Sequence, residues 1–299
     1  MNRYREKFEY ALLCTLTGLL KPLPVRLIER FFHLLGTLFF TLNRRRRIIT
    51  LRNLALAFPE KTPDERRAIA KQTFINIAEF IGDSFLLMAN KFSSEEICSM
   101  VDGSQLDSKY RVHRAASSNG ALHITGHLGN WELMAHYAAL QGLNSHVIAR
   151  KGNNILIEER IITPLRTRYG NKIFYKDNAM LNTIKALKRN EAVSFLIDQK
   201  IGSKEGVQVQ LFGHTANAVA SCAVIQMRFN PLVIPVFMVK NARRRYQVIV
   251  GDPITWQDDG SPKEEQIQKL TQRHQQVIED MVRKYPDQWF WMHNRWKLK

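Results

Sequence analysis

The stretch Ala121-Leu-His-Ile-Thr-Gly-His-Leu-Gly-Asn-Trp-Glu-Leu-Met-Ala-His-Tyr-Ala-Ala-Leu140 decides the fold, because its hydrophobic pattern changes within a few residues. The first five residues form a short apolar run, which is typical of a buried strand. Gly126 and Gly129 then favour a loop, and Asn130 is a preferred cap for a helix. The apolar residues that follow recur at helical spacing. We therefore predict a strand, a loop and a helix in this order.

The same alternation continues on both sides of this stretch. Short apolar runs predict buried strands at 121–125, 145–149, 192–197 and 232–239, and amphipathic stretches predict helices at 130–141, 155–168, 179–189 and 217–229. Strands that alternate with helices are typical of an α/β fold, here a mixed sheet flanked by helices. Pro235 cannot donate to a sheet ladder, so we expect the last strand at a sheet edge or at a bulge. Ser261-Pro-Lys-Glu264 predicts a capped helix start.

His127 and Glu132 lie on either side of the predicted loop and are the candidate catalytic residues. Functional groups of α/β proteins gather at the carboxyl ends of strands. On one helix, side chains five residues apart point about 140° away from each other, so the pair can meet only if His127 precedes the helix. Glu132 would then orient the imidazole, whose other nitrogen would act as a general base on a hydroxyl. Spacing alone leaves a purely structural pair open.

We expect no metal and no cofactor. His123, His127 and His136 lack the H-E-x-x-H pattern of zinc enzymes, and no serine lies in a G-x-S-x-G setting. The cysteines show no CxxC spacing, which fits a reducing compartment and predicts small buried side chains at Cys14, Cys98 and Cys222.

Four further residues are candidates for substrate binding. Asp198 follows the predicted strand 192–197, as His127 follows its own strand, so both can face one cleft. There Asp198 would be a polar partner for the pair of His127 and Glu132 or for an acceptor hydroxyl, and a cap for the next loop is the alternative. Arg150, Arg166 and Arg168 flank the predicted helix 155–168, and their guanidinium groups suit phosphate. A solvated basic face is the alternative for these arginines.

Residues 1–47 are predicted to be a membrane-associating segment, and residues 48–299 to be one catalytic domain. Two apolar runs of about a dozen residues, separated by Pro22 and Pro24, are shorter than the ~20 residues that cross a bilayer. Arg44-Arg-Arg-Arg47 follows directly, a pattern that favours contact with an anionic leaflet. A pair of core helices and a single spanning helix over residues 8–42 are the alternatives.

The composition predicts an anionic partner. Lys and Arg total 44 against 27 Asp and Glu, a formal net charge of +17. Nucleic acid, anionic lipid, phosphorylated substrates and an acidic carrier protein all suit this charge. We find no helix-turn-helix, zinc-finger or RNP signature, so we expect no nucleic-acid partner. A non-catalytic basic membrane or nucleic-acid binding protein is the competing class.

The chain resembles the lipid A late acyltransferases, the Kdo-dependent lauroyl and myristoyl transferase family of the H-x4-D/E acyltransferase superfamily. The residues that carry the resemblance are His127-Leu-Gly-Asn-Trp-Glu132, Arg52-Asn-Leu54 with Phe58-Pro-Glu60, Arg150 with Asn153, Arg166-Thr-Arg168-Tyr-Gly170, Asp198-Gln199, Leu211-Phe-Gly213 and Trp289-x-Trp291-x-His293-Asn-Arg295-Trp296-Lys297. The F-P-E-G-T block of glycerol-3-phosphate acyltransferases is missing, and the nearest stretch is Lys204-Glu-Gly-Val207.

This resemblance implies a glycerolipid-acyltransferase-like fold and transfer of a fatty acyl group from acyl carrier protein to a hydroxyl of a lipid A precursor. It also implies attachment to the cytoplasmic face of a bacterial inner membrane, and acceptor contacts for the three arginines. Another glycolipid or phospholipid acceptor is the alternative. The C-terminal tryptophans and Arg295 are expected as packing residues and membrane-interface anchors.

Overall fold

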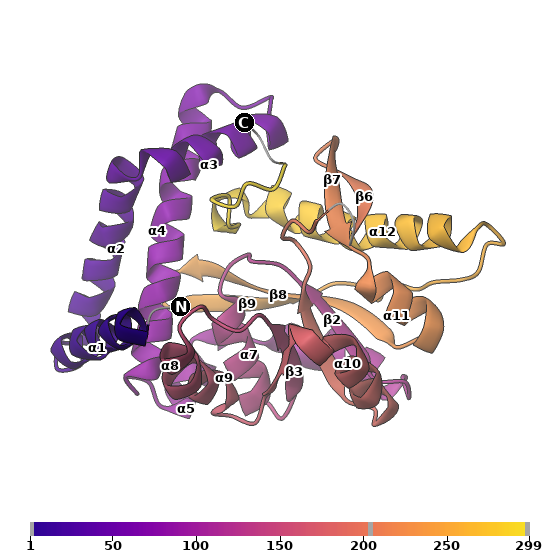
Figure 1. The fold of residues 1–299 in the computed structure, drawn as a ribbon, viewed down its shortest axis with the longest axis horizontal. Coiled ribbons are helices and arrows are strands. Elements are labelled where there is room, and N and C mark those ends of the chain that lie inside the picture. Colours follow the sequence, from indigo (N-terminus) through magenta and orange to yellow (C-terminus); the bar gives the residue numbers. More distant parts are fainter. Residues whose placement is uncertain (1–2, 203–205, 297–299) are drawn as a thin grey trace.

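A seven-stranded sheet forms the centre of the protein in a computed structural model that describes residues 3–202 and 206–296 (Figure 1). Lys204, Glu205 and Lys297 of the stretches quoted above lie outside the described residues. The strand order in the sheet is β1-β9-β8-β2-β5-β3-β4. The strands are β1 (Val101–Asp102), β2 (Ala121–Thr125), β3 (Ser145–Ala149), β4 (Lys172–Tyr175), β5 (Ala192–Leu196), β8 (Leu232–Ala242) and β9 (Arg245–Val250).

Within this seven-stranded sheet of the described residues, β8 and β9 run antiparallel, and the other neighbouring strands run parallel. The predicted α/β fold with a mixed sheet flanked by helices is therefore confirmed, as are strands at all four predicted places. The strand β8 alternates between two cores along its length. Ile234, Val236 and Met238 belong to one apolar cluster, and Val233, Phe237 and Val239 belong to the other. Successive strand residues point to opposite faces, so this strand is buried on both.

Helices cover both faces of the sheet. Residues of α5 (Ser94–Ser99), α7 (Trp131–Leu140) and α9 (Thr163–Thr167) belong to one cluster, and those of α10 (Ala179–Lys188), α11 (Ser221–Phe229) and α12 (Lys263–Lys284) belong to the other. The remaining short elements are α6 (Val112–Ala115), α8 (Ile155–Ile157), the π-helical turns η1 (Leu106–Arg111) and η2 (Glu158–Ile162), and the 3-10 turns η3 (Lys176–Asn178) and η4 (Pro286–Gln288). A separate hairpin of β6 (Gly206–Leu211) and β7 (His214–Val219) packs on α12.

Pro235 does not mark an edge strand, so this prediction was wrong. The strand β8 lies between β9 and β2, and its register irregularity falls between Lys240 and Ala242. Pro235 is the last residue of β8 that pairs with β2, and pairing with β9 begins at the next residue, Val236. The proline therefore lies where the strand exchanges one neighbour for the other. The carbonyl of Pro235 accepts a hydrogen bond from the Gly251 N–H.

The N-terminal part of the chain forms four helices to one side of the sheet (Figure 1). They are α1 (Arg3–Leu20), α2 (Val25–Leu42), α3 (Arg44–Ala57) and α4 (Pro63–Met88). The chain turns at residues 21–24, so a single helix across residues 8–42 is wrong. None of the helices in the described residues is long and apolar enough to cross a membrane. The predicted division at residue 47 falls within α3.

The helix α2 packs closely on α4. A Cβ added at Gly36 of α2 would lie 2.7 Å from the Ile75 Cα, which shows how near the two backbones run. Many large apolar side chains of α1 and α2 nevertheless remain exposed, among them Phe8, Leu12, Leu19, Leu34, Leu38 and Leu42. Two of the four clustered arginines are bound to the protein itself. Arg46 donates to the Met292 carbonyl, and Arg47 donates to the carbonyls of Phe40 and Thr41.

Candidate active site

The site lies where two neighbouring parallel strands end. Thr125 of β2 pairs with Leu196 of β5, and each strand is followed two residues later by a candidate side chain, His127 or Asp198. Carboxyl ends of adjacent parallel strands meet at one edge of a sheet. Gly126 permits the close approach, because a Cβ there would lie 3.2 Å from the Asp198 side chain.

Asp198 orients His127 through two hydrogen bonds. The His127 Nδ1 lies 2.7 Å from Asp198 Oδ1, and the His127 backbone N–H donates to Oδ2 at 2.8 Å. The Trp289 indole N–H donates to the same Oδ2 at 2.8 Å. Asp198 is buried, yet these donors and the charge of His127 lower its pKa to about 2. An ionised acceptor at Nδ1 requires a proton there and leaves Nε2 unprotonated in the neutral imidazole.

Burial alone would lower the pKa of His127, but the charge and hydrogen bond of Asp198, with the charge of Glu132, raise it above its ordinary value. The Nε2 atom lies 3.2 Å from the Gln199 amide nitrogen, which donates to it. The imidazole is 22% exposed and lies between the rings of Trp131 and Phe290. His127 is thus a partly accessible base at the end of β2.

Glu132 does not hold His127, contrary to the expected arrangement. It lies in the first turn of α7, where both of its oxygens accept from Arg166 Nε, at 3.0 and 3.1 Å, and Oε1 also accepts from Nη2. Arg166 comes from α9, which packs on α7. The physical reason is that Asp198, at the end of the adjacent strand, occupies the Nδ1 side of the imidazole. Glu132 therefore acts on His127 through its charge and on Arg166 by direct contact.

The loop that carries His127 is fixed from two sides. The Asn130 N–H donates to Met238 O of β8, and the Gly129 N–H donates to Gln288 O. The Phe290 N–H donates to His127 O. Gly129 has a φ of +64°, and a Cβ there would lie 1.8 Å from Met238 O. Only glycine fits this position without a rearrangement.

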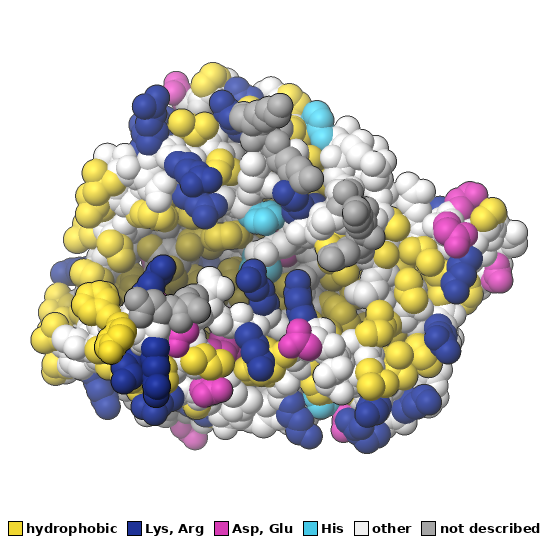
Figure 2. All heavy atoms as spheres, viewed as in Figure 1, with side chains coloured by type: hydrophobic (Ala, Val, Ile, Leu, Met, Phe, Trp, Pro, Cys, Tyr) yellow, Lys and Arg dark blue, Asp and Glu magenta, His cyan; other side chains and the backbone are white. Residues whose placement is uncertain are grey.

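The three candidate arginines occupy different surroundings. Arg166 forms the ion pair with Glu132 described above. Arg168 donates to the Leu87 carbonyl of α4. Arg150 is exposed in the loop after β3. The structure therefore brings Arg166 to Glu132 and Asp198 to His127. Figure 2 shows a hollow on this face of the molecule, with Lys and Arg side chains along it and hydrophobic side chains gathered over α1 and α2.

The direct contacts of Gln199 with His127 and of Trp289 with Asp198 were not predicted, although both residues belong to the stretches that carry the family resemblance. The predicted membrane-interface role of the C-terminal tryptophans is wrong for Trp289 and Trp291, which are buried. Arg295 is also buried and donates to Asn217 O. No group of three or more His, Cys, Asp and Glu side chains that could hold a metal occurs in the described residues.

Comparisons with known proteins agree on one family. The family model described as bacterial lipid A biosynthesis acyltransferase matches residues 3–298. The lipid A biosynthesis lauroyltransferase of Escherichia coli (strain K12) is 26% identical over 283 residues, 94% of this chain and 89% of that protein. The lipid A biosynthesis palmitoleoyltransferase of the same strain is 26% identical over 86% of this chain and 80% of its own length. A lipid A biosynthesis acyltransferase of Haemophilus influenzae is 24% identical over 93% and 86%, respectively.

Proposed function

Because this chain belongs to the bacterial lipid A biosynthesis acyltransferase family, it is an acyltransferase, and we propose that it transfers a fatty acyl chain from acyl carrier protein to a hydroxyl of a lipid A precursor. The observation that carries the proposal is the hydrogen bond from His127 Nδ1 to Asp198, which leaves Nε2 as the base on a partly exposed ring. The relatives named above support the acceptor, because lipid A biosynthesis is part of their names.

In this mechanism His127 Nε2 takes the proton of the acceptor hydroxyl, and the oxygen of that hydroxyl attacks the carbonyl carbon of the thioester. The tetrahedral intermediate then collapses, the carbon–sulfur bond breaks, and the imidazolium returns the proton to the departing thiolate. The hydroxyl must first replace the Gln199 amide, which donates to Nε2 in the free enzyme. Asp198 stabilises the imidazolium that forms, and it stays ionised because its pKa is about 2.

Glu132 and Arg166 would act together at the acceptor. Arg166 holds Glu132 in the first turn of α7, and Glu132 raises the pKa of the neighbouring His127. We assign Arg150, Arg166 and Arg168 to the acceptor phosphates, with Arg166 nearest the reacting groups. The ion pair means that a phosphate would share Arg166 with Glu132, so this arginine would link acceptor binding to the position of Glu132.

The N-terminal helices would place the enzyme at an anionic membrane surface, the cytoplasmic face of the bacterial inner membrane. The exposed apolar side chains of α1 and α2 and the outward arginines Arg44 and Arg45 support this placement. An apolar face beside basic residues is typical of helices that lie in the interface. The lipid acceptor would then reach His127 without leaving the bilayer surface.

The test is an acyl transfer assay with purified protein, a lipid A precursor and either acyl carrier protein or coenzyme A as donor. We expect transfer from the carrier, and loss of about 10²–10⁴-fold in kcat for His127→Ala, which removes the base. His214→Ala, an exposed histidine on β7, should keep full activity. Near-normal turnover by a folded His127→Ala protein would refute the mechanism, and preference for coenzyme A or a glycerophospholipid acceptor would refute the substrates.

A further inference from the structure

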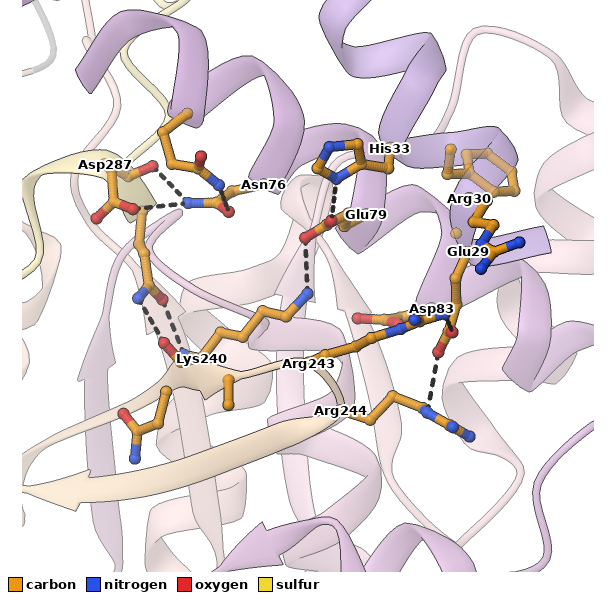
Figure 3. Close-up of a pocket in the computed structure, with 16 residues that line it drawn as sticks. Glu29, Arg30, His33, Asn76, Glu79, Asp83, Lys240, Arg243, Arg244 and Asp287 are labelled. Atoms are coloured by element: carbon orange, nitrogen blue, oxygen red, sulfur yellow. Dashed lines mark hydrogen bonds and ion pairs between the residues drawn. The ribbon is translucent and has the colours of Figure 1, made fainter. Parts of the chain in front are cut away.

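A charged cavity lies behind the catalytic loop, between α2, α4 and the turn that joins β8 to β9 (Figure 3). Its volume is about 500 Å³. A smaller cavity shares Asp83, Asn76, Lys240 and Gln288 with it and reaches the backbone of the loop at Gly129 and Asn130. The two cavities thus connect the N-terminal helices with the back of the active site.

Most charges in the large cavity neutralise one another. The Lys240 ammonium lies 2.7 Å from Glu79, which also bonds His33 Nδ1 at 2.9 Å (Figure 3). Glu29 pairs with both Arg243 and Arg244 of the turn. These internal pairs leave little net charge for a ligand to recognise.

Three other charged groups line the cavity. Arg30 is exposed, and Asp287 accepts a hydrogen bond from Asn76. Asp83 differs from both, because its hydrogen-bond donors are neutral groups. Its Oδ2 accepts from the Asn130 amide at 3.0 Å and from the Tyr246 hydroxyl. Desolvation by the surrounding protein raises the pKa of Asp83 to about 6, although Lys240 and the Tyr246 hydroxyl lower it; Glu79 and Glu29 add to the rise.

Asn130 links this carboxylate to the catalytic residues. Its side chain is buried, and its Oδ1 accepts from the Leu133 N–H as the N-cap of α7. Its backbone N–H binds Met238 O. Asn130 therefore lies between the loop that carries His127 and the helix turn that carries Glu132, and it bonds to both β8 and α7. With its amide nitrogen bound to Asp83, Asn130 can present only its oxygen to the helix.

We propose that Asp83 is a positioning residue for acyl transfer, which holds Asn130 in the orientation that fixes His127 and Glu132 relative to each other. The inference rests on the proposed function of His127. Hydrogen bonds to a charged acceptor are roughly twice as strong as those to a neutral one. Asp83 therefore holds Asn130 most firmly when it is ionised, and the cavity gives water access to its carboxyl group.

In this arrangement, activity depends on the protonation of Asp83 as well as on that of His127. As the pH falls, activity is lost first through protonation of His127, whose pKa lies above its ordinary value, and protonation of Asp83 near pH 6 adds to the loss. In the wild type, kcat should therefore fall more steeply below pH 6 than one titrating group allows. In Asp83→Asn the fall should be that of one group, and kcat at pH 8 should be lower by about three- to tenfold with an unchanged KM.

Tyr246→Phe provides an independent test. The Tyr246 hydroxyl donates to Asp83 and lowers its pKa, so its removal should move the steep part of the profile to higher pH. The matched control is Asp287→Asn, a carboxylate of the same cavity with no bond to Asn130, which should leave the profile unchanged. Asp83→Asn should also melt no lower than the wild type at pH 8, because the raised pKa means that ionised Asp83 lowers stability above pH 6.

A wild-type kcat and an equally steep acid limb in Asp83→Asn, with His127→Ala inactive, would overturn the inference. An unmoved profile in a folded Tyr246→Phe protein would overturn it as well. If His127→Ala is itself active, the proposed function fails instead, so the two failures are distinguishable.

Discussion

The carboxylate of Asp198 receives three N–H donors, two from His127 and one from Trp289. This number of donors fixes the ring of His127 as well as its protonated nitrogen, because each donor restrains the carboxylate from another direction. Asp198 lies 71 residues after His127 in the chain, and the parallel pairing of β2 with β5 brings the two together. The geometry of the base therefore depends on the sheet more than on the H-x4-E spacing.

Asp198→Asn should lower kcat by about 10²–10⁴-fold without unfolding the protein. The amide oxygen of the new asparagine would accept from the His127 backbone N–H and the Trp289 indole N–H. Its amide nitrogen would then face His127 Nδ1, and the ring proton would have to move to Nε2. Loss of the charge also removes a cause of the raised pKa of His127, so the acid limb of the remaining activity should move to lower pH. A pH profile of kcat measures both effects.

Glu191→Gln is the matched control for this substitution. Glu191 forms a similar pair with His146, 2.8 Å apart, at the opposite ends of the strands. Its loss should leave acyl transfer unchanged. An equal loss of activity in both variants would mean that the effect is structural.

Arg166→Ala should lower kcat and raise the KM for the lipid acceptor. The kcat effect follows from release of Glu132, and the KM effect follows from a lost phosphate contact. Arg166→Lys should restore only part of the activity, because an ammonium replaces a two-pronged donor. Arg189→Ala, which breaks an exposed ion pair, is the control. A raised KM for acyl carrier protein alone would assign Arg166 to the carrier instead.

The sequence predicted which candidate residues lie near one another better than it predicted their hydrogen-bond partners. His127, Glu132, Asp198 and Arg166 all lie at one end of the sheet, as their places after strands or beside helices suggested. The partners depend on side-chain directions across strands and helices, and a spacing of five residues contains no information on a carboxylate from another strand. The structure therefore changed the partner of His127 from Glu132 to Asp198.

Among the elements, the loop between β2 and α7 is tightly constrained by its neighbours. Gly129→Ala should abolish activity and lower the melting temperature, because its Cβ would overlap Met238 O. Gly142→Ala is the control, since Gly142 also has a positive φ of +75° but no atom within 4 Å of an added Cβ. The control should lose about 1–2 kcal/mol of stability and keep its activity. Thermal melts and kcat separate the two contributions.

Periodicity located four strands of the central sheet, but it missed β1, β4, β9 and the hairpin of β6 and β7, whose second strand overlaps the predicted helix 217–229. It also did not predict how two of the predicted elements are bounded. Pro235 fits a central strand because β8 stops pairing with β2 at this residue and starts pairing with β9 at the next one. This arrangement cannot be predicted without knowing both neighbouring strands. The helix α12 begins at Lys263, and the Ser261 side chain bonds Asp259 instead of capping the helix, so the predicted capping box was wrong. The Ser261 hydroxyl donates to Asp259, which lies outside the four residues of the capping pattern, so the pattern could not predict this bond.

In the molecule as a whole, the N-terminal helices hold residues 287–293. This segment forms one wall of the site, because Trp289 bonds Asp198 and Phe290 lies beside His127. Asn53 of α3 donates to the carbonyls of Trp291 and His293, and Asn76 of α4 donates to the Asp287 carbonyl. This segment in turn binds the catalytic loop. Arg46 also donates to the Met292 carbonyl of this segment. Removal of residues 1–47 would therefore disturb the site as well as any membrane contact, so point substitutions are the better test of membrane association.

Substitution of Leu34, Leu38 and Leu42 by Gln should weaken binding to anionic vesicles by at least about 100-fold. These exposed side chains of α2 recur at helical spacing, and each leucine buried in lipid contributes about 1.5–3 kcal/mol. Arg44→Gln with Arg45→Gln should weaken binding by about 1 kcal/mol per residue, an effect that salt removes. Vesicle sedimentation at two salt concentrations measures both.

Exposed apolar residues away from α1 and α2 provide the control. Met180→Gln with Leu181→Gln on α10 should leave vesicle binding unchanged. Equal binding by the α2 variant and the wild type would exclude this helix from the membrane contact. The net charge of +17 predicted an anionic partner but no location, because composition does not tell which arginines are bound within the protein, as Arg46 and Arg47 are.

The ring of Trp131 lies 5.0 Å from that of His127, edge to face. A protonated imidazole quenches the fluorescence of a nearby indole, whereas a neutral one does so weakly. Light emission from the resting enzyme should therefore increase as the pH rises through the pKa of His127, and the difference between wild type and Trp131→Phe isolates this signal from the other tryptophans. The proposed catalytic base thus has an optical reporter beside it, which follows the protonation of His127 with neither substrate nor label.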